Sequence, residues 1–185
     1  MARIGIYCGS FSPVHKGHIR IAKQCLKQKL VDKVMIIATG SYWNKNDLLP
    51  LKDRLNMLDL VKDKGIIIDK KHNEYPYTYQ IFRELKKERP DDTFSLILGA
   101  DNLINFSDWK EYKELLEYDF IIVNRQDIDA RKYLAELNKT NYHILELEQM
   151  DISSSYIRDH LDDYQLIKDM IDERVYEYLK KRKDS

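Results

Sequence analysis

Short runs of β-branched and other apolar residues alternate along this chain with longer segments of helical periodicity, and this alternation limits the folds open to it. The apolar runs cover residues 4–8, 34–39, 66–68, 93–98, 120–123 and 142–147, and they predict buried strands. The segments near 17–29, 51–63, 77–88, 102–117 and 127–138 predict amphipathic helices. Because parallel neighbours need crossover connections, this order predicts an α/β, doubly wound fold with a mostly parallel sheet and helices on both faces.

The length and the C-terminal pattern favour a single domain over residues 1–185. A chain of 185 residues with 43% hydrophobic content is near the size of one domain with one sizeable core. Beyond Met150, apolar residues at helical spacing predict a few terminal helices, and no linker separates them from the rest. Sheets of this kind bind ligands beyond the carboxyl ends of their strands, where the strand order reverses.

The charge balance and the cysteine count exclude several classes of protein. Lys and Arg together number 31, as do Asp and Glu, so nothing favours a nucleic-acid or membrane partner. No leader or long apolar segment is visible, which makes the cytoplasm the expected location. Two cysteines are too few for a disulfide framework or a four-thiolate zinc site.

The segment 9–18, GSFSPVHKGH, follows the first predicted strand and opens the first predicted helix. Gly9 lets backbone approach a ligand, and the helix start offers free N–H donors to a phosphate. His15 and His18 stand three residues apart, so both imidazoles can lie on one side of the first helical turn, with Gly17 leaving room. An isolated pair at this spacing is more often two surface histidines, but the strand–loop–helix setting favours phosphate binding.

Other known metal-binding and phosphate-binding motifs do not match this segment. Zinc would need a third cysteine, histidine or carboxylate at a recognisable spacing, so we predict no metal ligands in the protein. Neither a Walker loop nor the dinucleotide fingerprint GxGxxG is present.

A second polar cluster, DISSSYIR at 151–158, is predicted at the start of a C-terminal helix. Consecutive serines such as Ser153 and Ser154 can cap a helix and donate to phosphate oxygens. Arg158, one turn further, can hold two phosphate oxygens at once. Alone, the cluster is equally well explained as an ordinary helix cap with a solvated arginine.

Taken together, the two clusters resemble the signatures of the nucleotidylyltransferase superfamily: HxGH at 15–18 and ISS followed by Ser or Thr, two residues and Arg at 152–158. The resemblance covers essentially the whole chain and implies a Rossmann-like fold that binds ATP. It implies that His15, His18 and Arg158 are catalytic and that Gly9, Ser10 and Phe11 line the nucleotide site. Family members often carry Asp where this chain has Ser12.

The middle of the chain is similar to the bacterial nicotinate-nucleotide adenylyltransferases. Gly99 and Asp101 match their GAD element, which lies at the nucleotide site, while Trp109, Tyr77 and Thr78 match elements near the acceptor. The face of Trp109 could attract a pyridinium ring by roughly 0.5–2 kcal/mol, and a helix start at 77–78 could hold its carboxylate. Core packing explains Trp109 equally well, and Asp101 could be a helix cap.

The loop after the second predicted strand departs from these relatives, which often show Pro-Pro-His-Lys. This chain has Ser-Tyr-Trp-Asn-Lys at 41–45, in which Lys45 can keep a phosphate contact. Arg54 resembles the family's arginine on the next helix. Trp43 has no match, and a packing role at the solvent edge is favoured over a lid.

The resemblance implies transfer of AMP from ATP to nicotinate mononucleotide, with His15 and His18 on the α- and β-phosphates. Lys45, Ser153, Ser154 and Arg158 would hold the outgoing pyrophosphate, and Mg²⁺ would accompany ATP. Alternatives are another adenylyltransferase acting on nicotinamide mononucleotide or phosphopantetheine, and a non-catalytic nucleotide-binding module. The sequence leaves a homo-oligomer open.

Overall fold

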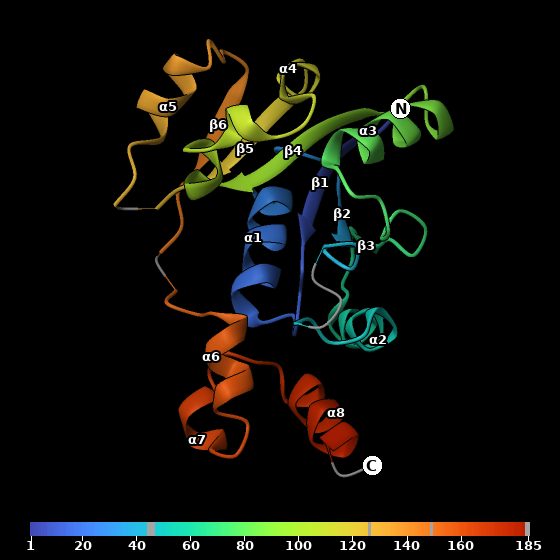
Figure 1. Ribbon diagram of the computed structural model, residues 1–185, viewed down its shortest axis with the longest axis vertical. Coiled ribbons are helices and arrows are strands. Elements are labelled where there is room, and N and C mark those ends of the chain that lie inside the picture. Colours follow the sequence, from blue (N-terminus) through green and yellow to red (C-terminus); the bar gives the residue numbers. More distant parts are fainter. Residues whose placement is uncertain (44–46, 126, 149, 184–185) are drawn as a thin grey trace.

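A six-stranded, entirely parallel sheet forms the centre of the computed structural model, which describes residues 1–43, 47–125, 127–148 and 150–183. The strands are β1 Arg3–Gly9, β2 Lys33–Ala38, β3 Ile66–Ile68, β4 Thr93–Gly99, β5 Asp119–Val123 and β6 Tyr142–Leu145. Their order is β3-β2-β1-β4-β5-β6 (Figure 1). The predicted parallel α/β fold is therefore confirmed, with strand ends displaced by at most two residues.

Helices cover both faces of the sheet. On one face α1 Lys16–Lys27 and α2 Leu51–Val61 pack, and on the other α3 Thr78–Glu88 and α5 Ala130–Glu136. Alternation along β1 produces this division, because Ile4 and Ile6 join the core under α3 and α5 while Tyr7 packs on the α1 side.

The prediction of one helix over 102–117 was wrong. Two 3₁₀ turns, η1 Ala100–Leu103 and η2 Phe106–Asp108, and a single turn of helix, α4 Tyr112–Leu115, occupy this segment. Glu111 has a φ of 56°, a left-handed conformation that no α-helix continues through. Asn105, Ser107 and Asp108 favour turns over helix interior. Leu103, Phe106 and Leu115 are still buried, since short turns bring them to the same core.

Three helices follow the sheet, as the apolar pattern predicts: α6 Ser154–Asp159, α7 Tyr164–Ile167 and α8 Glu173–Lys183. They gather below the sheet, on the side of α1 and α2 (Figure 1). Ile157, Ile167 and Val175 are fully buried and belong to the same core as α1 and α2. None of the helices that the structure describes is long and apolar enough to cross a membrane.

Candidate active site

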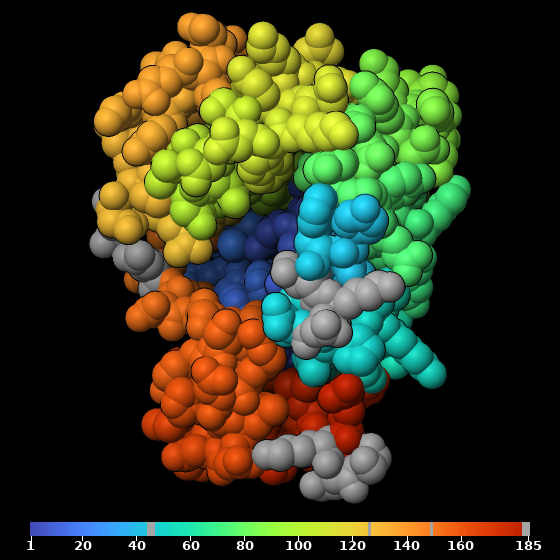
Figure 2. Space-filling model, viewed as in Figure 1, coloured from blue at the N-terminus to red at the C-terminus, as the bar shows by residue number. Residues whose placement is uncertain are grey.

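A pocket of about 630 Å³ lies at the carboxyl ends of β1, β4 and β5. It opens between β1 and β4, where the strand order reverses, which is the position predicted for ligands of such sheets. Figure 2 shows the hollow, with N-terminal residues in blue at its floor and the segment around residue 105 in yellow-green above it. Nine of the residues predicted from the sequence line it: Gly9, Ser10, Phe11, His15, His18, Thr78, Gly99, Asp101 and Trp109.

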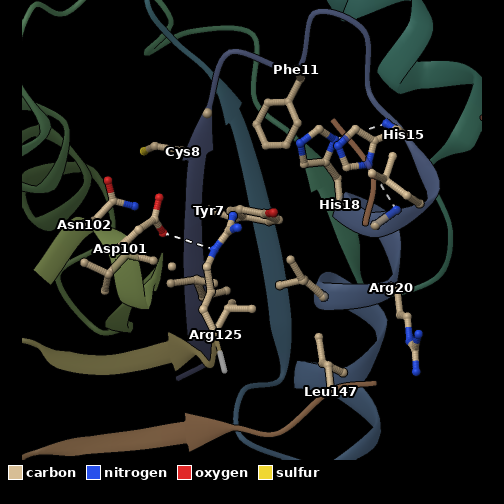
Figure 3. A pocket seen from close by; sticks show the side chains of 18 of the residues that line it. Tyr7, Cys8, Phe11, His15, His18, Arg20, Asp101, Asn102, Arg125 and Leu147 are labelled. Carbon is tan, nitrogen blue, oxygen red and sulfur yellow. Dashed lines mark hydrogen bonds and ion pairs between the residues drawn. The ribbon is translucent and has the colours of Figure 1, made fainter. Parts of the chain in front are cut away.

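The two histidines of the first cluster cap the helix that they open. His15 is the N-cap of α1, and its Nδ1 accepts a hydrogen bond from the Gly17 N–H at 3.1 Å. The His15 N–H in turn donates to Nδ1 of His18 at 3.0 Å. The two rings stack with centroids 3.6 Å apart (Figure 3). A Cβ at Gly17 would lie 2.9 Å from the His15 ring, so only glycine fits there.

This reciprocal cap fixes the protonation of both rings. Because each Nδ1 accepts a backbone N–H, the neutral imidazole carries its proton on Nε2. Burial lowers the pKa of His15 to about 4. Burial, followed by the nearby charge of His15, holds the pKa of His18 well below 6.5. At neutral pH, each ring therefore presents one Nε2–H donor without carrying a charge.

Phe11 holds the loop before the histidines in a conformation that most residues avoid. Its φ is 46°, a left-handed value that costs on the order of 1 kcal/mol for a residue with a Cβ. The ring is almost fully buried and meets His18 edge-on, with centroids 4.7 Å apart, and Tyr7 at 5.3 Å. This packing stabilises the strained turn and places the backbone of Gly9 and Ser10 at the pocket.

The C-terminal cluster docks on the same loop from the far end of the chain. Ser153 is the N-cap of α6 and accepts the Tyr156 N–H at 3.0 Å. The Ser154 hydroxyl donates to the Pro13 carbonyl at 2.9 Å, and the Arg158 guanidinium donates to the Ser12 carbonyl. Ser153, Ser154 and Arg158 therefore lie beside the pocket, behind the loop of residues 9–15, rather than in its lining.

Arg54 is the most deeply buried cation near the site, with 1% of its surface exposed. Its guanidinium donates to the carbonyls of Ser10 at 2.8 Å, Thr39 at 2.7 Å and Leu49 at 2.9 Å, and to the Ser41 hydroxyl at 2.6 Å. Every one of these acceptors is neutral. Burial lowers the pKa of the Arg54 guanidinium. Arg54 thus holds the loop after β1 against the loop after β2.

Asp101 lies on the opposite side of the pocket, in η1 after β4. Its carboxylate is 3.4 Å from Nε of Arg125, and the two side chains reach toward each other across the pocket (Figure 3). Both are about half exposed, so the pair is open to ligand and solvent. A Cβ at Gly99 would lie 2.5 Å from the Asp101 carboxylate, so a larger residue there would turn this half-exposed side chain out of its present position.

The third wall carries the residues matched to the acceptor. Thr78 begins α3, and Trp109 both lines the pocket and packs on Phe106, with ring centroids 4.8 Å apart. Tyr77 is outside the lining, and its ring meets that of Trp43. Trp43 is 57% exposed, and its indole N–H donates to the Pro76 carbonyl at 2.7 Å. Lys45, predicted to contact phosphate, lies outside the described residues.

Several pocket residues were missed by the sequence analysis: Tyr7, Cys8, Arg20, Asn124, Arg125 and Leu147. Arg125 directly follows β5, so the rule that ligands bind at strand carboxyl ends could have found it. Tyr7 and Cys8 lie inside an apolar strand and give no such signal. Burial raises the pKa of Cys8 to about 12, which keeps the thiol protonated.

Among residues 1–43, 47–125, 127–148 and 150–183, no group of three or more histidine, cysteine or acidic side chains could hold a metal ion. His15 and His18, both half-buried, accept hydrogen bonds from backbone N–H groups through Nδ1 and stack on each other. Their arrangement suits anion binding through neutral N–H donors.

Comparison with known proteins places this geometry among nucleotide-transferring enzymes. Residues 6–160 match the family described as cytidylyltransferase-like. A protein of Fusobacterium nucleatum subsp. nucleatum described as a probable nicotinate-nucleotide adenylyltransferase is 32% identical over 97% of each chain. One with the same description from Flavobacterium johnsoniae is 29% identical, over 96% of this chain and 95% of the relative. The solved Plasmodium falciparum nicotinic acid mononucleotide adenylyltransferase complexed with NaAD has a TM-score of 0.84 at 24% identity, covering 98% of this chain and 96% of the other.

Proposed function

This chain belongs to the cytidylyltransferase-like family, and we propose that, as a nucleotidyltransferase, it transfers AMP from ATP to nicotinate mononucleotide. The products are the deamido form of NAD and pyrophosphate. The observation that carries the proposal is the stacked His15–His18 pair, whose Nε2–H donors have no partner among the residues that the structure describes and lie at a pocket where the strand order reverses. The relatives at 29–32% identity that carry this activity in their names support the choice of acceptor.

The reaction needs no covalent intermediate with the protein. An oxygen of the acceptor phosphate attacks the α-phosphorus of ATP, the bond from that phosphorus to the β-bridging oxygen breaks, and pyrophosphate leaves with the electron pair. Negative charge spreads over the phosphoryl oxygens during transfer, so catalysis rests on positioning and fixed donors. The Nε2–H groups of His15 and His18 supply two such donors.

The cap on α1 makes these donors rigid before the substrates arrive. Each histidine keeps its position when negative charge develops on the phosphate, because its Nδ1 already accepts a hydrogen bond from a backbone N–H. The Nε2–H donor therefore does not need to reorient during the reaction. Doubly protonating either ring would break that bond, since Nδ1 would then carry a proton. The histidines therefore act as fixed hydrogen-bond donors rather than as general acids.

The remaining pocket divides between the two substrates. Asn124, Arg125 and Leu147, at the ends of β5 and β6, are left for the adenosine of ATP, while Thr78 and Trp109 face the acceptor. Ser154 and Arg158 support residues 12–13 and, on loosening these contacts, can reach the outgoing pyrophosphate together with Ser153, the N-cap of α6. Lys45 belongs to the same proposal.

Magnesium would enter with ATP, held by triphosphate oxygens and water. The pocket carboxylates Asp101 and Asp151 are the side chains that could accept hydrogen bonds from those waters, which fits an ion that keeps much of its hydration shell. When bound, the ion neutralises charge on the phosphates.

We also propose that the protein acts in the cytoplasm.

The test is pyrophosphate release from ATP and magnesium with nicotinate mononucleotide, nicotinamide mononucleotide and phosphopantetheine compared side by side. We expect turnover with nicotinate mononucleotide to exceed that with the other two. Turnover only with phosphopantetheine would overturn the acceptor assignment of residues 77–109 and leave the transfer chemistry standing. Binding of ATP without turnover of any acceptor would instead mark a nucleotide-binding module.

A further inference from the structure

A second cavity, here called the rear cavity, lies against the start of α1, the end of α2 and the start of α8. Its volume is about 470 Å³. Val14, Ile19 and Val61 supply apolar lining, and Val14 and Val61 belong to the buried core. An apolar floor with a polar rim is the usual make-up of a small-molecule site.

The rim of the rear cavity is rich in cations. Lys16, Arg20, Lys23, Lys62 and Arg174 line it, against only two carboxylates, Asp63 and Asp172. The whole chain has no formal net charge, so this excess is local. Such an excess, converging on one cavity, favours an anion over a neutral ligand.

Both carboxylates of the rim are already engaged. Asp63 lies 3.3 Å from Nζ of Lys23, and Asp172 lies 3.0 Å from Nη2 of Arg174. The Arg174 side chain is the main cause of the lowered pKa of Asp172, and Lys16 adds a smaller effect. In the part of the chain that the structure describes, neither Lys16 nor Lys62 has a carboxylate within 4.0 Å.

From this charge and shape we propose that the rear cavity binds a small phosphate-bearing anion, with Lys16 and Lys62 as its principal cationic contacts. A lysine ammonium group binds phosphate as a compact point charge, and the apolar floor leaves room for an attached organic group. Inorganic pyrophosphate is the probe, a choice that rests on the proposed function because that reaction releases it.

The rear cavity adjoins the catalytic pocket through shared residues. His15, Arg20 and Met150 line both. In Figure 3 the Arg20 side chain extends away from the histidine pair and from Tyr7, along the outside of α1. An anion in the rear cavity therefore lies behind His15 while the triphosphate lies in front of it, and like-charge repulsion opposes simultaneous binding. The rear cavity would then sense the product of the reaction.

The test counts pyrophosphate sites by calorimetry in the wild type and in single variants. We expect two classes of site in the wild type. Lys62→Glu, at an exposed position at the end of α2, should weaken one class by about tenfold or more and should not weaken the other. Arg158→Ala should weaken only the other class.

Lys27→Glu is the matched control, because it makes the same charge change at an exposed position of α1 that does not line the rear cavity. It should leave both classes as in the wild type. A single class of site in the wild type, or equal effects of Lys62→Glu and Lys27→Glu, would overturn the proposal.

The same variants separate this proposal from the proposed function. Lys62→Glu should keep wild-type turnover at saturating substrates and should lose part of the inhibition by added pyrophosphate. If no acceptor turns over but two classes of pyrophosphate site remain, the reaction is wrong and the rear cavity stands. If nicotinate mononucleotide is turned over but only one class of pyrophosphate site is found, the proposed reaction stands and the rear-cavity proposal is wrong.

Discussion

The pocket has two proposed sides, the phosphate side formed by residues 9–18 and the acceptor side around Thr78 and Trp109, and they are built in different ways. On the phosphate side, Phe11, Ser12 and Arg54 are buried to 1% exposure or less, and hydrogen bonds from α2 and from α6 hold the loop. The acceptor side, by contrast, consists of the start of α3 and the short turn that ends at Trp109, and the nearby ring of Trp43 is 57% exposed.

This difference separates the chemistry from the choice of acceptor. A rigid loop is needed where donors must be in place before charge develops. Short turns and exposed rings can change without disturbing the core, so the acceptor side can vary among relatives that share one reaction. Substitutions should therefore affect turnover on the phosphate side and acceptor affinity on the other.

His18→Ala gives the largest expected effect, because it removes one fixed Nε2–H donor and the acceptor of the His15 N–H. We expect kcat to fall by about 10²–10³, or about 3–4 kcal/mol at the transition state. Pyrophosphate release measures it. His143→Ala, at an exposed position of β6, is the control and should keep wild-type turnover. Near-normal turnover in His18→Ala would remove the histidines from the mechanism.

Arg54→Met tests whether the phosphate side depends on its buried cation. The change leaves the carbonyls of Ser10, Thr39 and Leu49 without their donor, so the free energy of unfolding should fall by about 3 kcal/mol. Denaturant titration measures this fall, and Arg54→Lys should recover part of it. Arg131→Ala, at an exposed position of α5, should change stability little, and a similar loss there would contradict the assignment.

A pH series tests the neutral state of the histidine cap. Unfolded His15 binds a proton near pH 6.5, whereas the folded pKa is about 4, so the unfolded chain binds more protons between these values. Stability should therefore fall as pH drops through this window, by roughly 2 kcal/mol after allowance for partial exposure. His15→Asn can still cap α1 but does not titrate, and its stability should fall less between pH 7 and 4.5. If the stability of the wild type and of His15→Asn fell equally between pH 7 and 4.5, the neutral state of His15 in the folded protein would be contradicted.

Trp109→Ala probes the acceptor side. Losing the ring face should raise KM for nicotinate mononucleotide by about 2- to 30-fold, which corresponds to roughly 0.5–2 kcal/mol, with KM for ATP and kcat nearly unchanged. Trp109→Phe keeps an aromatic face, so its KM for nicotinate mononucleotide should lie between the values of the wild type and of Trp109→Ala. A fall in kcat without a change in KM would show that the two sides of the pocket are not separable in this way.

Trp43→Phe should have the smallest effect. It removes only the indole N–H bond to the Pro76 carbonyl, an exposed contact worth about 0.5 kcal/mol. KM for the acceptor should rise about twofold, as measured in the same assay. Tyr42→Phe, next to it, keeps its ring and serves as the control. A rise in KM of tenfold or more would indicate that Trp43 contacts the substrate directly.

The sequence predicted the phosphate side more fully than the acceptor side, and the reason is local geometry. His15, Gly17 and His18 interact across three residues, so their spacing alone indicates how the rings lie. The C-terminal cluster was predicted at a helix start, and Ser153 does cap α6. That its neighbours Ser154 and Arg158 bind the carbonyls of Pro13 and Ser12 depends on contacts across more than 140 residues, which no local pattern encodes.

The failures lie where packing decides the conformation. The apolar spacing over 102–117 predicted a helix, but turn-forming residues and the left-handed Glu111 break it into shorter pieces. Tyr7 and Cys8 gave no signal, because a pocket residue inside a strand is indistinguishable from core. The neutral acceptors around Arg54 were equally invisible, since three of the four are backbone carbonyls.

The docking of Ser154 and Arg158 on residues 12–13 also bears on the order in which the chain acquires activity during synthesis. The histidine cap needs only neighbouring residues and can form once the segment of α1 has left the ribosome. The contacts that hold the preceding loop wait for residues made 141 and 146 positions later. A nascent chain would thus carry both histidines long before the loop that aims them is secured.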